Sequence, residues 1–168
     1  LLEKKNNKYM GSTFKEVHEK AYQAGAGLLA MGVQKGDRIA LFSEGRNDWV
    51  ISELGIFYSG GVNVPLSVKL SEPSELRFRI DHSGARFIIA SKNQAKKIVP
   101  IMDSLPKLEK LILLDSQEDY QNFEMPFAEI LDKGREFLRS SSEKFKERWT
   151  SVQGNDYANI CYTSGTTA

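Results

Sequence analysis

The chain has 168 residues, 40% of them hydrophobic and 27% charged, and its formal net charge is +1 at pH 7. These values are ordinary for a soluble globular domain, and a charge so close to zero gives no reason to expect a nucleic-acid partner. The single cysteine, Cys161, excludes a disulfide framework within the chain, and no apolar run is long enough for a signal peptide or a membrane span, so we expect a cytoplasmic protein.

The predicted elements begin with a helix at Thr13, because Thr13 and Glu16 have the spacing of a capping box. Residues 1–11 precede it as an N-terminal arm, and residues 12–168 form the main domain. Behind the cap, apolar residues recur at helical spacing until Gly32, which should end the helix. The predicted buried face consists of Phe14, Val17, Ala21, Ala24, Leu28 and Met31.

A strand at 38–43 and a helix at 46–59 follow, and then a short strand at 62–64 directly before Pro65. Large aromatic rings dominate buried area, so we expect the aromatic residues of this second helix to lie in the core. Its predicted buried side carries Trp49, Val50, Leu54, Ile56 and Phe57.

The alternation continues with a helix at 71–82, a strand at 85–90, a helix at 92–104 and a strand at 110–114. The texture then changes. Residues 116–125 read as a polar loop and 126–149 as a charged, mostly helical stretch. Within it, the mixed signs of residues 132–148 favour a solvated helix over a membrane-surface helix. The last predicted strand, 158–162, contains Cys161 as a small buried residue. His82 is expected at a helix end and receives no role.

Helices of this length between strands indicate parallel pairing, because antiparallel neighbours could be joined by tight turns. The predicted fold class is therefore α/β, a mostly parallel sheet with helices on both faces. Ligands bind such sheets beyond the carboxyl ends of the strands. The last strand is followed there by Thr163, Ser164, Gly165, Thr166 and Thr167.

The composition of this loop suits a phosphate. Gly165 permits a tight turn in which several N–H groups converge on one anion, and the four hydroxyl groups could donate to phosphate or ligate a nucleotide-bound Mg²⁺. No Lys or Arg follows in the chain, and neither GxxxxGK[ST] nor GxGxxG is present. An exposed turn rich in small residues explains the composition equally well.

Other readings of the loop stay open or are disfavoured on chemistry. Ser164 is a poor candidate for an acyl-transfer nucleophile, because the GxSxG elbow requires glycine where Tyr162 stands. Two alternatives lie outside the enzymes: a flavodoxin-like module that holds the phosphate of FMN, and a doubly wound interaction domain without a ligand. In flavodoxin-like proteins the loop follows the first strand, and a colourless purified protein would count against FMN.

Residues 160–167, ICYTSGTT, resemble the start of the signature [YF]TSGTTGxPKG of the adenylate-forming (AMP-binding) superfamily, which includes acyl-CoA synthetases, peptide-synthetase adenylation domains and luciferases. TFKEV at 13–17 is similar to the family's TYxEL helix start, and GVQKGDRIA at 32–40 to its GVxxGDRVA segment. NDWV at 47–50 and GGVNVPL at 60–66 resemble segments of long-chain fatty acid–CoA ligases. The chain thus looks like the N-terminal part of such an enzyme, cut within the phosphate-binding loop.

This resemblance implies a two-step reaction in which a carboxylate attacks the α-phosphate of ATP, pyrophosphate leaves, and a thiol then displaces AMP. It implies that Thr163, Ser164, Gly165, Thr166 and Thr167 hold the β- and γ-phosphates. ATP, Mg²⁺ and coenzyme A are the implied cofactors, and a fatty acid or another carboxylic acid is the implied substrate. The catalytic lysine is expected beyond residue 168, so the chain alone is expected to be inactive.

Further expectations concern the ends and surfaces of the chain. Ala168 stands where the family usually has glycine, and alanine tolerates a positive φ poorly. An incomplete sheet would expose an edge and apolar surface, which predicts self-association. Peripheral contact with a membrane is left open for an enzyme that uses fatty acids.

Overall fold

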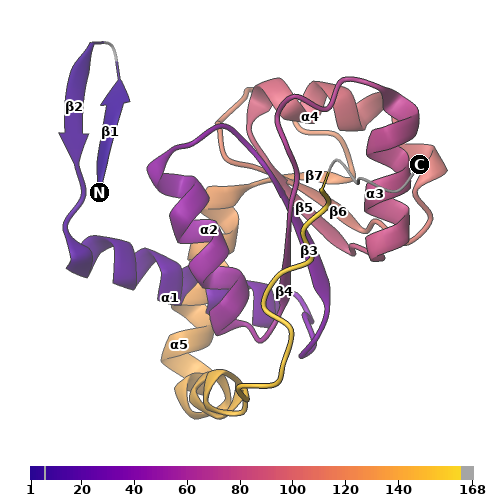
Figure 1. Cartoon of the computed structure of the whole chain (residues 1–168). Helices are drawn as coiled ribbons and strands as arrows, with labels where there is room; N and C mark the ends of the chain where they lie inside the picture. The colour runs from indigo at the N-terminus through magenta and orange to yellow at the C-terminus, as the bar shows by residue number, and fades with distance from the viewer. Residues whose placement is uncertain (6, 164–168) are drawn as a thin grey trace.

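The sheet has five parallel strands in the order β4-β3-β5-β6-β7 in the computed structural model, which describes residues 1–5 and 7–163 (Figure 1). The strands are β3 (Arg38–Phe42), β4 (Val62–Pro65), β5 (Phe87–Ala90), β6 (Lys110–Leu113) and β7 (Glu124–Pro126). The first strand of the sheet in the sequence, β3, is an inner strand, and the second, β4, is the edge strand beside it, as in doubly wound folds. The predicted α/β class with a parallel sheet is confirmed.

Helices cover both faces of this sheet, as expected (Figure 1). One face packs against α1 (Phe14–Ala30), α2 (Asn47–Tyr58) and α5 (Phe127–Thr150). The other packs against α3 (Pro73–Ser83), α4 (Lys92–Ile98) and the 3₁₀ turn η1 (Val99–Ser104). Successive side chains of a strand point to opposite faces, so Ile39 and Leu41 enter the first core and Ala40 and Phe42 the second.

The expected N-terminal arm is folded as an antiparallel hairpin of β1 (Leu2–Lys5) and β2 (Lys8–Gly11), which projects from the body of the domain (Figure 1). Polar contacts hold its base. The amino group of Leu1 donates to the Ser12 carbonyl at 2.7 Å, and the Asn47 N–H donates to the Glu3 carboxylate at 3.2 Å. The second bond ties the hairpin to the first turn of α2.

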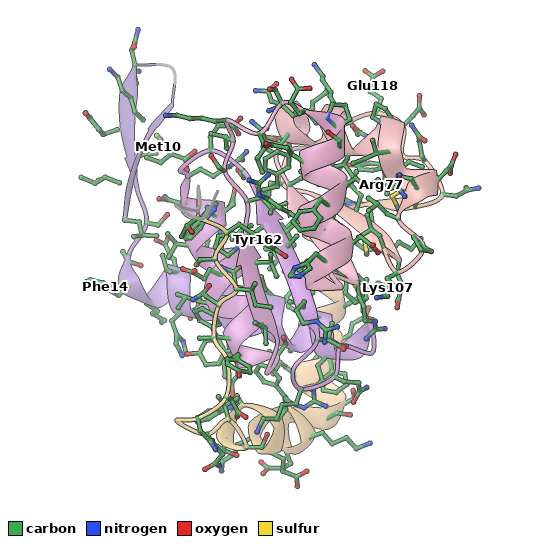
Figure 2. The ribbon with its side chains drawn as sticks, turned by 45° about the vertical axis from the view of Figure 1, so that its right-hand side comes forward. Met10, Phe14, Arg77, Lys107, Glu118 and Tyr162 are labelled. Carbon is green, nitrogen blue, oxygen red and sulfur yellow. The ribbon has the colours of Figure 1, made fainter. Side chains whose placement is uncertain are left out.

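The capping box at the start of α1 is confirmed, with Thr13 accepting from the Glu16 N–H and Glu16 accepting from the Thr13 N–H. The predicted burial of Phe14 is wrong, because its side chain is 91% exposed. Phe14 occupies the first turn, which lies at the outer edge of the molecule (Figure 2). Helical spacing placed Phe14 on the apolar face of α1, but no other element packs against that face at this end of the helix.

Small residues let α1 approach α2 and α5 closely. A methyl group built on Gly55 of α2 would lie 2.7 Å from the Ala24 Cβ, and one on Gly25 would lie 2.6 Å from the Tyr58 Cβ. Methyl groups on Gly27 and Gly134 would overlap carbonyl oxygens of α5 and α1, respectively. The backbones of the three helices are therefore in direct contact.

This close contact explains why the predicted buried side of α2 is only partly correct. The helix buries Ile51, Ser52, Gly55 and Ile56, whereas Trp49 and Phe57 pack at the margin of the core and stay half-buried. Because α1 requires small residues opposite it, the aromatic rings are displaced to the flanks. An apolar-periodicity argument overlooks Ser52 and Gly55, since neither is hydrophobic.

The charged stretch predicted as a solvated helix is α5, and it is only half solvated. Its backbone bends at Ser141, where φ is −147° and ψ is 35°. On the inner side, Ile130 and Phe145 are fully buried, and the Phe145 ring meets that of Tyr22 edge-on at 4.6 Å between centroids. The helix therefore covers α1 with its inner side, while most of its other residues are exposed, as the charged sequence predicts.

The polar loop predicted at 116–125 ends in β7, a strand that the sequence analysis did not predict. It pairs with β6 from Glu124 opposite Leu111 to Pro126 opposite Leu113. Three residues that end in proline carry no alternating pattern. Only the neighbouring strand defines this one.

We expect Gly134→Ala to destabilise the domain by roughly 3 kcal/mol, the upper end for overpacking, because the added methyl group must displace the Gln23 carbonyl of α1. Gly154→Ala is the matched control, since nothing lies within 4 Å of a methyl group built there. Urea unfolding followed by circular dichroism measures both. Equal stability of the two variants would show that the helices are not in backbone contact.

Candidate functional site

The segment that leads into the predicted loop lies beside β4, but it is not the strand predicted at 158–162. Asn63 makes both backbone bonds between them: its N–H donates to the Ala158 carbonyl and its carbonyl accepts from the Ile160 N–H, each at 2.9 Å. The next donor on this side of β4 would be the nitrogen of Pro65, which has no hydrogen. Pairing therefore ends at a single bridge.

The short pairing also accounts for Cys161, which is exposed rather than buried as predicted. Ile160 and Tyr162 both pack on the core shared with α3. In an extended segment the intervening side chain points the opposite way. With no further strand on that side among the described residues, Cys161 faces solvent.

The segment runs parallel to β4, so its end lies at the carboxyl edge of the sheet, the edge at which ligands bind in doubly wound folds. Of the five predicted site residues, the structure describes only Thr163, and it is exposed at this edge. Ser164, Gly165, Thr166 and Thr167 lie outside the described residues. Their assignment stays a prediction.

Tyr162, the residue directly before Thr163, packs against α3 (Figure 2). Its hydroxyl donates to the Arg79 carbonyl at 3.2 Å and lies 2.9 Å from the His82 Nδ1. Burial raises the pKa of the Tyr162 phenol, against the opposing effects of the Ser83 hydroxyl and the Arg79 cation. The phenol therefore keeps its proton at neutral pH and can donate.

A shallow hollow of about 420 Å³ lies between α3 and this anchor, and it is lined by Ser74, Glu75, Phe78, Arg79, Tyr162 and Thr163. The Arg79 guanidinium lies 5.9 Å from the centre of the Tyr162 ring and pairs with Glu75 at 3.1 Å. The fold brings this cation beside Thr163 from a helix more than 80 residues earlier in the chain, and nothing in the local sequence indicates this.

A larger cavity, about 760 Å³, lies at the opposite edge of the sheet. It is bordered by the starts of β3 and β4, at Arg38 and Val62, and by the 152–158 segment. Lys35 closes one side through an ion pair with Asp156 at 2.6 Å. Because parallel sheets bind ligands at their carboxyl ends, the Thr163 edge remains the candidate site despite the smaller volume there.

A second polar cluster occupies the carboxyl ends of β3, β5 and β6. The Gln94 amide donates to Glu44 at 2.6 Å, and Ser91 caps α4. Asp115 accepts from Arg46 at 2.7 Å and from the Lys92 N–H at 2.8 Å. These residues bond mainly to one another, so the cluster joins three strand ends. Sequence reasoning missed it, although polar residues directly after buried strands are a usable signal.

Two features are absent from the described residues, 1–5 and 7–163. No group of three or more His, Cys, Asp or Glu side chains in this part of the chain is arranged to hold a metal ion. No described helix is long and apolar enough to cross a membrane.

The family model described as "AMP-binding enzyme" matches residues 4–168, which is nearly the whole chain. The chain belongs to the AMP-binding enzyme family. Among curated relatives, it is 28% identical over 164 residues to the Arabidopsis thaliana long-chain-fatty-acid–[acyl-carrier-protein] ligase AEE15, covering 92% of this chain and 23% of that protein. It is 25% identical over 168 residues to 4-hydroxybutyrate–CoA ligase 2 of Metallosphaera sedula, covering 97% and 28%.

Solved structures of AMP-binding ligases have the same fold. The anthranilate CoA ligase AuaEII in complex with anthranoyl-AMP superposes with a TM-score of 0.72 at 24% identity, covering 97% of this chain and 29% of that chain. Coronafacic acid ligase from Pectobacterium brasiliense gives 0.71 at 24% identity, covering 93% and 29%. The chain thus spans about a quarter of the length of these proteins, and likeness at this identity supports the fold alone.

We expect acid to weaken the domain in part through Glu44. Burial acts to raise the pKa of this carboxyl, but hydrogen bonds from Ser91 and Gln94 outweigh it and lower the pKa below the ordinary value of 4.5. A lowered folded-state pKa stabilises the fold above 4.5, and this stability is lost as the pH falls through the folded value.

Glu44→Gln should therefore reduce stability at pH 7 and lose less of it on acidification than the wild type. The difference should stay below about 1 kcal/mol, because solvent screens an exposed group. Urea unfolding at pH 7 and pH 3 measures it. Glu118→Gln, at an exposed position in the 116–123 loop, is the control for the loss of one charge. A parallel pH response of Glu44→Gln and the wild type would rule out this contribution.

Proposed function

We propose that the protein containing this chain activates a carboxylic acid with ATP, forming an acyl-adenylate and pyrophosphate, and transfers the acyl group to coenzyme A. The observation that carries the proposal is the family match over residues 4–168, together with TSGTT directly after a segment that ends at the carboxyl edge of the sheet. Family membership also favours this ligase chemistry over the FMN-binding and ligand-free alternatives.

Within this proposal, Thr163, Ser164, Gly165, Thr166 and Thr167 hold the β- and γ-phosphates. Both steps build charge on phosphate oxygens, which preorganised N–H and hydroxyl donors stabilise. The exposed position of Thr163 at the carboxyl edge fits this role. Hydroxyl oxygens also suit Mg²⁺, which neutralises phosphate charge when it is bound with the nucleotide.

A fatty acid is the proposed substrate. Support comes from the names of the relatives, among them a long-chain-fatty-acid–[acyl-carrier-protein] ligase and the mycobacterial long-chain-fatty-acid–CoA ligase FadD15. Because the matched region is about a quarter of these proteins, we also propose that residues 1–168 alone form no adenylate. Self-association and peripheral membrane contact stay predictions, which light scattering and vesicle sedimentation would test.

We expect the protein expressed from its complete reading frame to catalyse ATP–pyrophosphate exchange that depends on an added fatty acid. Residues 1–168 alone should give none. Exchange with an aryl acid but with no fatty acid would contradict the substrate and leave adenylation standing. No exchange with any carboxylic acid would overturn the proposed reaction.

Thr163→Val in the same complete protein should lower exchange by roughly 10²- to 10³-fold, the range for loss of one preorganised donor. The change keeps the side-chain shape and removes the hydroxyl. Thr150→Val, at the end of α5, is the matched control and should leave exchange unchanged. Equal rates for the two variants would remove Thr163 from the site.

A further inference from the structure

His82 and Tyr162 meet across 80 residues of sequence at the point where the described chain reaches the carboxyl edge. The Tyr162 hydroxyl has one proton, and its neighbours include the Ser83 hydroxyl, the Arg79 carbonyl at 3.2 Å and the His82 Nδ1 at 2.9 Å. The carbonyl can only accept. The contacts with Arg79 and His82 are both hydrogen bonds when the phenol donates to the carbonyl and the His82 Nδ1–H donates to the phenol oxygen.

The imidazole is itself held in place on α3. It stacks on the Phe78 ring with 5.2 Å between centroids and an interplanar angle of 26°. It meets the Tyr162 ring at 5.9 Å and 70°, close to edge-on. Since Phe78, Arg79 and His82 all belong to α3, one rigid helix presents the donor, the acceptor carbonyl and the stacking surface.

This contact matters because little else secures the end of the segment. The backbone of residues 158–160 is bonded to β4 through Asn63 alone, and Pro65 ends the ladder. Cys161 points to solvent. Among the described residues, the Tyr162 side chain is the last attachment before Thr163.

We propose that His82 is a positioning residue, which acts through Tyr162 to fix the start of the TSGTT loop on α3. The expected effect of His82 on ATP binding rests on the proposed function, whereas the attachment of Tyr162 to α3 does not. His82 touches no substrate in this proposal. It restricts where Thr163, the first residue of the loop, lies at the carboxyl edge.

The test uses His82→Phe and His82→Asn in the complete protein. Phenylalanine keeps a ring to stack on Phe78 but has no donor, whereas the asparagine amide can place an N–H close to the position of Nδ1. Hydrogen–deuterium exchange of the peptide covering 158–167 is the direct measurement. His18→Phe is the control for loss of a histidine, because His18 stacks on Tyr22 at the far side of the sheet.

We expect His82→Phe to raise the exchange rate of this peptide roughly three- to tenfold, the worth of one hydrogen bond, while peptides of β3 and β5 are unchanged. His82→Asn should return it toward the wild-type rate. Tyr162→Phe also loses the bond to the Arg79 carbonyl, so it should raise the exchange rate at least as much as His82→Phe. The double variant should add nothing beyond Tyr162→Phe, because the bond between the two side chains is already lost.

The same variants separate this inference from the proposed reaction. His82→Phe should raise the KM for ATP in pyrophosphate exchange more than it lowers kcat. An unchanged hydrogen–deuterium exchange rate of the 158–167 peptide in His82→Phe overturns the inference. A His82→Asn variant whose peptide exchanges as fast as that of His82→Phe overturns it as well. If His82→Phe speeds hydrogen–deuterium exchange but the complete protein forms no adenylate, the attachment of Tyr162 to α3 stands and the proposed function is removed.

Discussion

The direct backbone contact of α1 with α2 and α5 is the constraint on which the rest of the domain depends. Gly27 and Gly134 leave no room for a methyl group between α1 and α5, and Gly55 leaves little between α1 and α2. The three helices therefore form one layer against the sheet. That layer fixes the strand positions and, through them, the carboxyl edge where the candidate site lies.

Two groups of polar residues lie at that edge, and they have different roles. The cluster around Glu44 and Gln94 fills the place where the strand order reverses, which general rules for α/β sheets favour for ligands. Its members are bonded mainly to one another. The candidate phosphate site lies instead beyond the edge strand β4, at the end of the segment 158–163. This segment pairs with β4 only at Asn63, because Pro65 has no N–H to continue the pairing. Thr163 is consequently held by a side chain rather than by a ladder.

The fold by itself would not distinguish a ligase from other nucleotide-binding proteins. The strand order matches the flavodoxin-like order, and one fold hosts many activities. What separates the readings is the position of the Ser/Thr/Gly loop after the last segment, together with the family match over residues 4–168. Here the site and the relatives carry the functional argument, and the architecture only places the site.

The sequence by itself determined the order of the helices and strands from α1 to β6, the parallel α/β class, the capping box at Thr13 and the family, because these follow from local patterns. Only the tertiary structure decided which residues are covered, since burial depends on what lies opposite. Phe14 has no neighbour, and α2 turns its small residues inward. Likewise, β7 exists only beside β6, and the contact of His82 with Tyr162 joins residues 80 positions apart. Spacing along one chain carries no record of such contacts, because they are set by the packing of whole helices and strands.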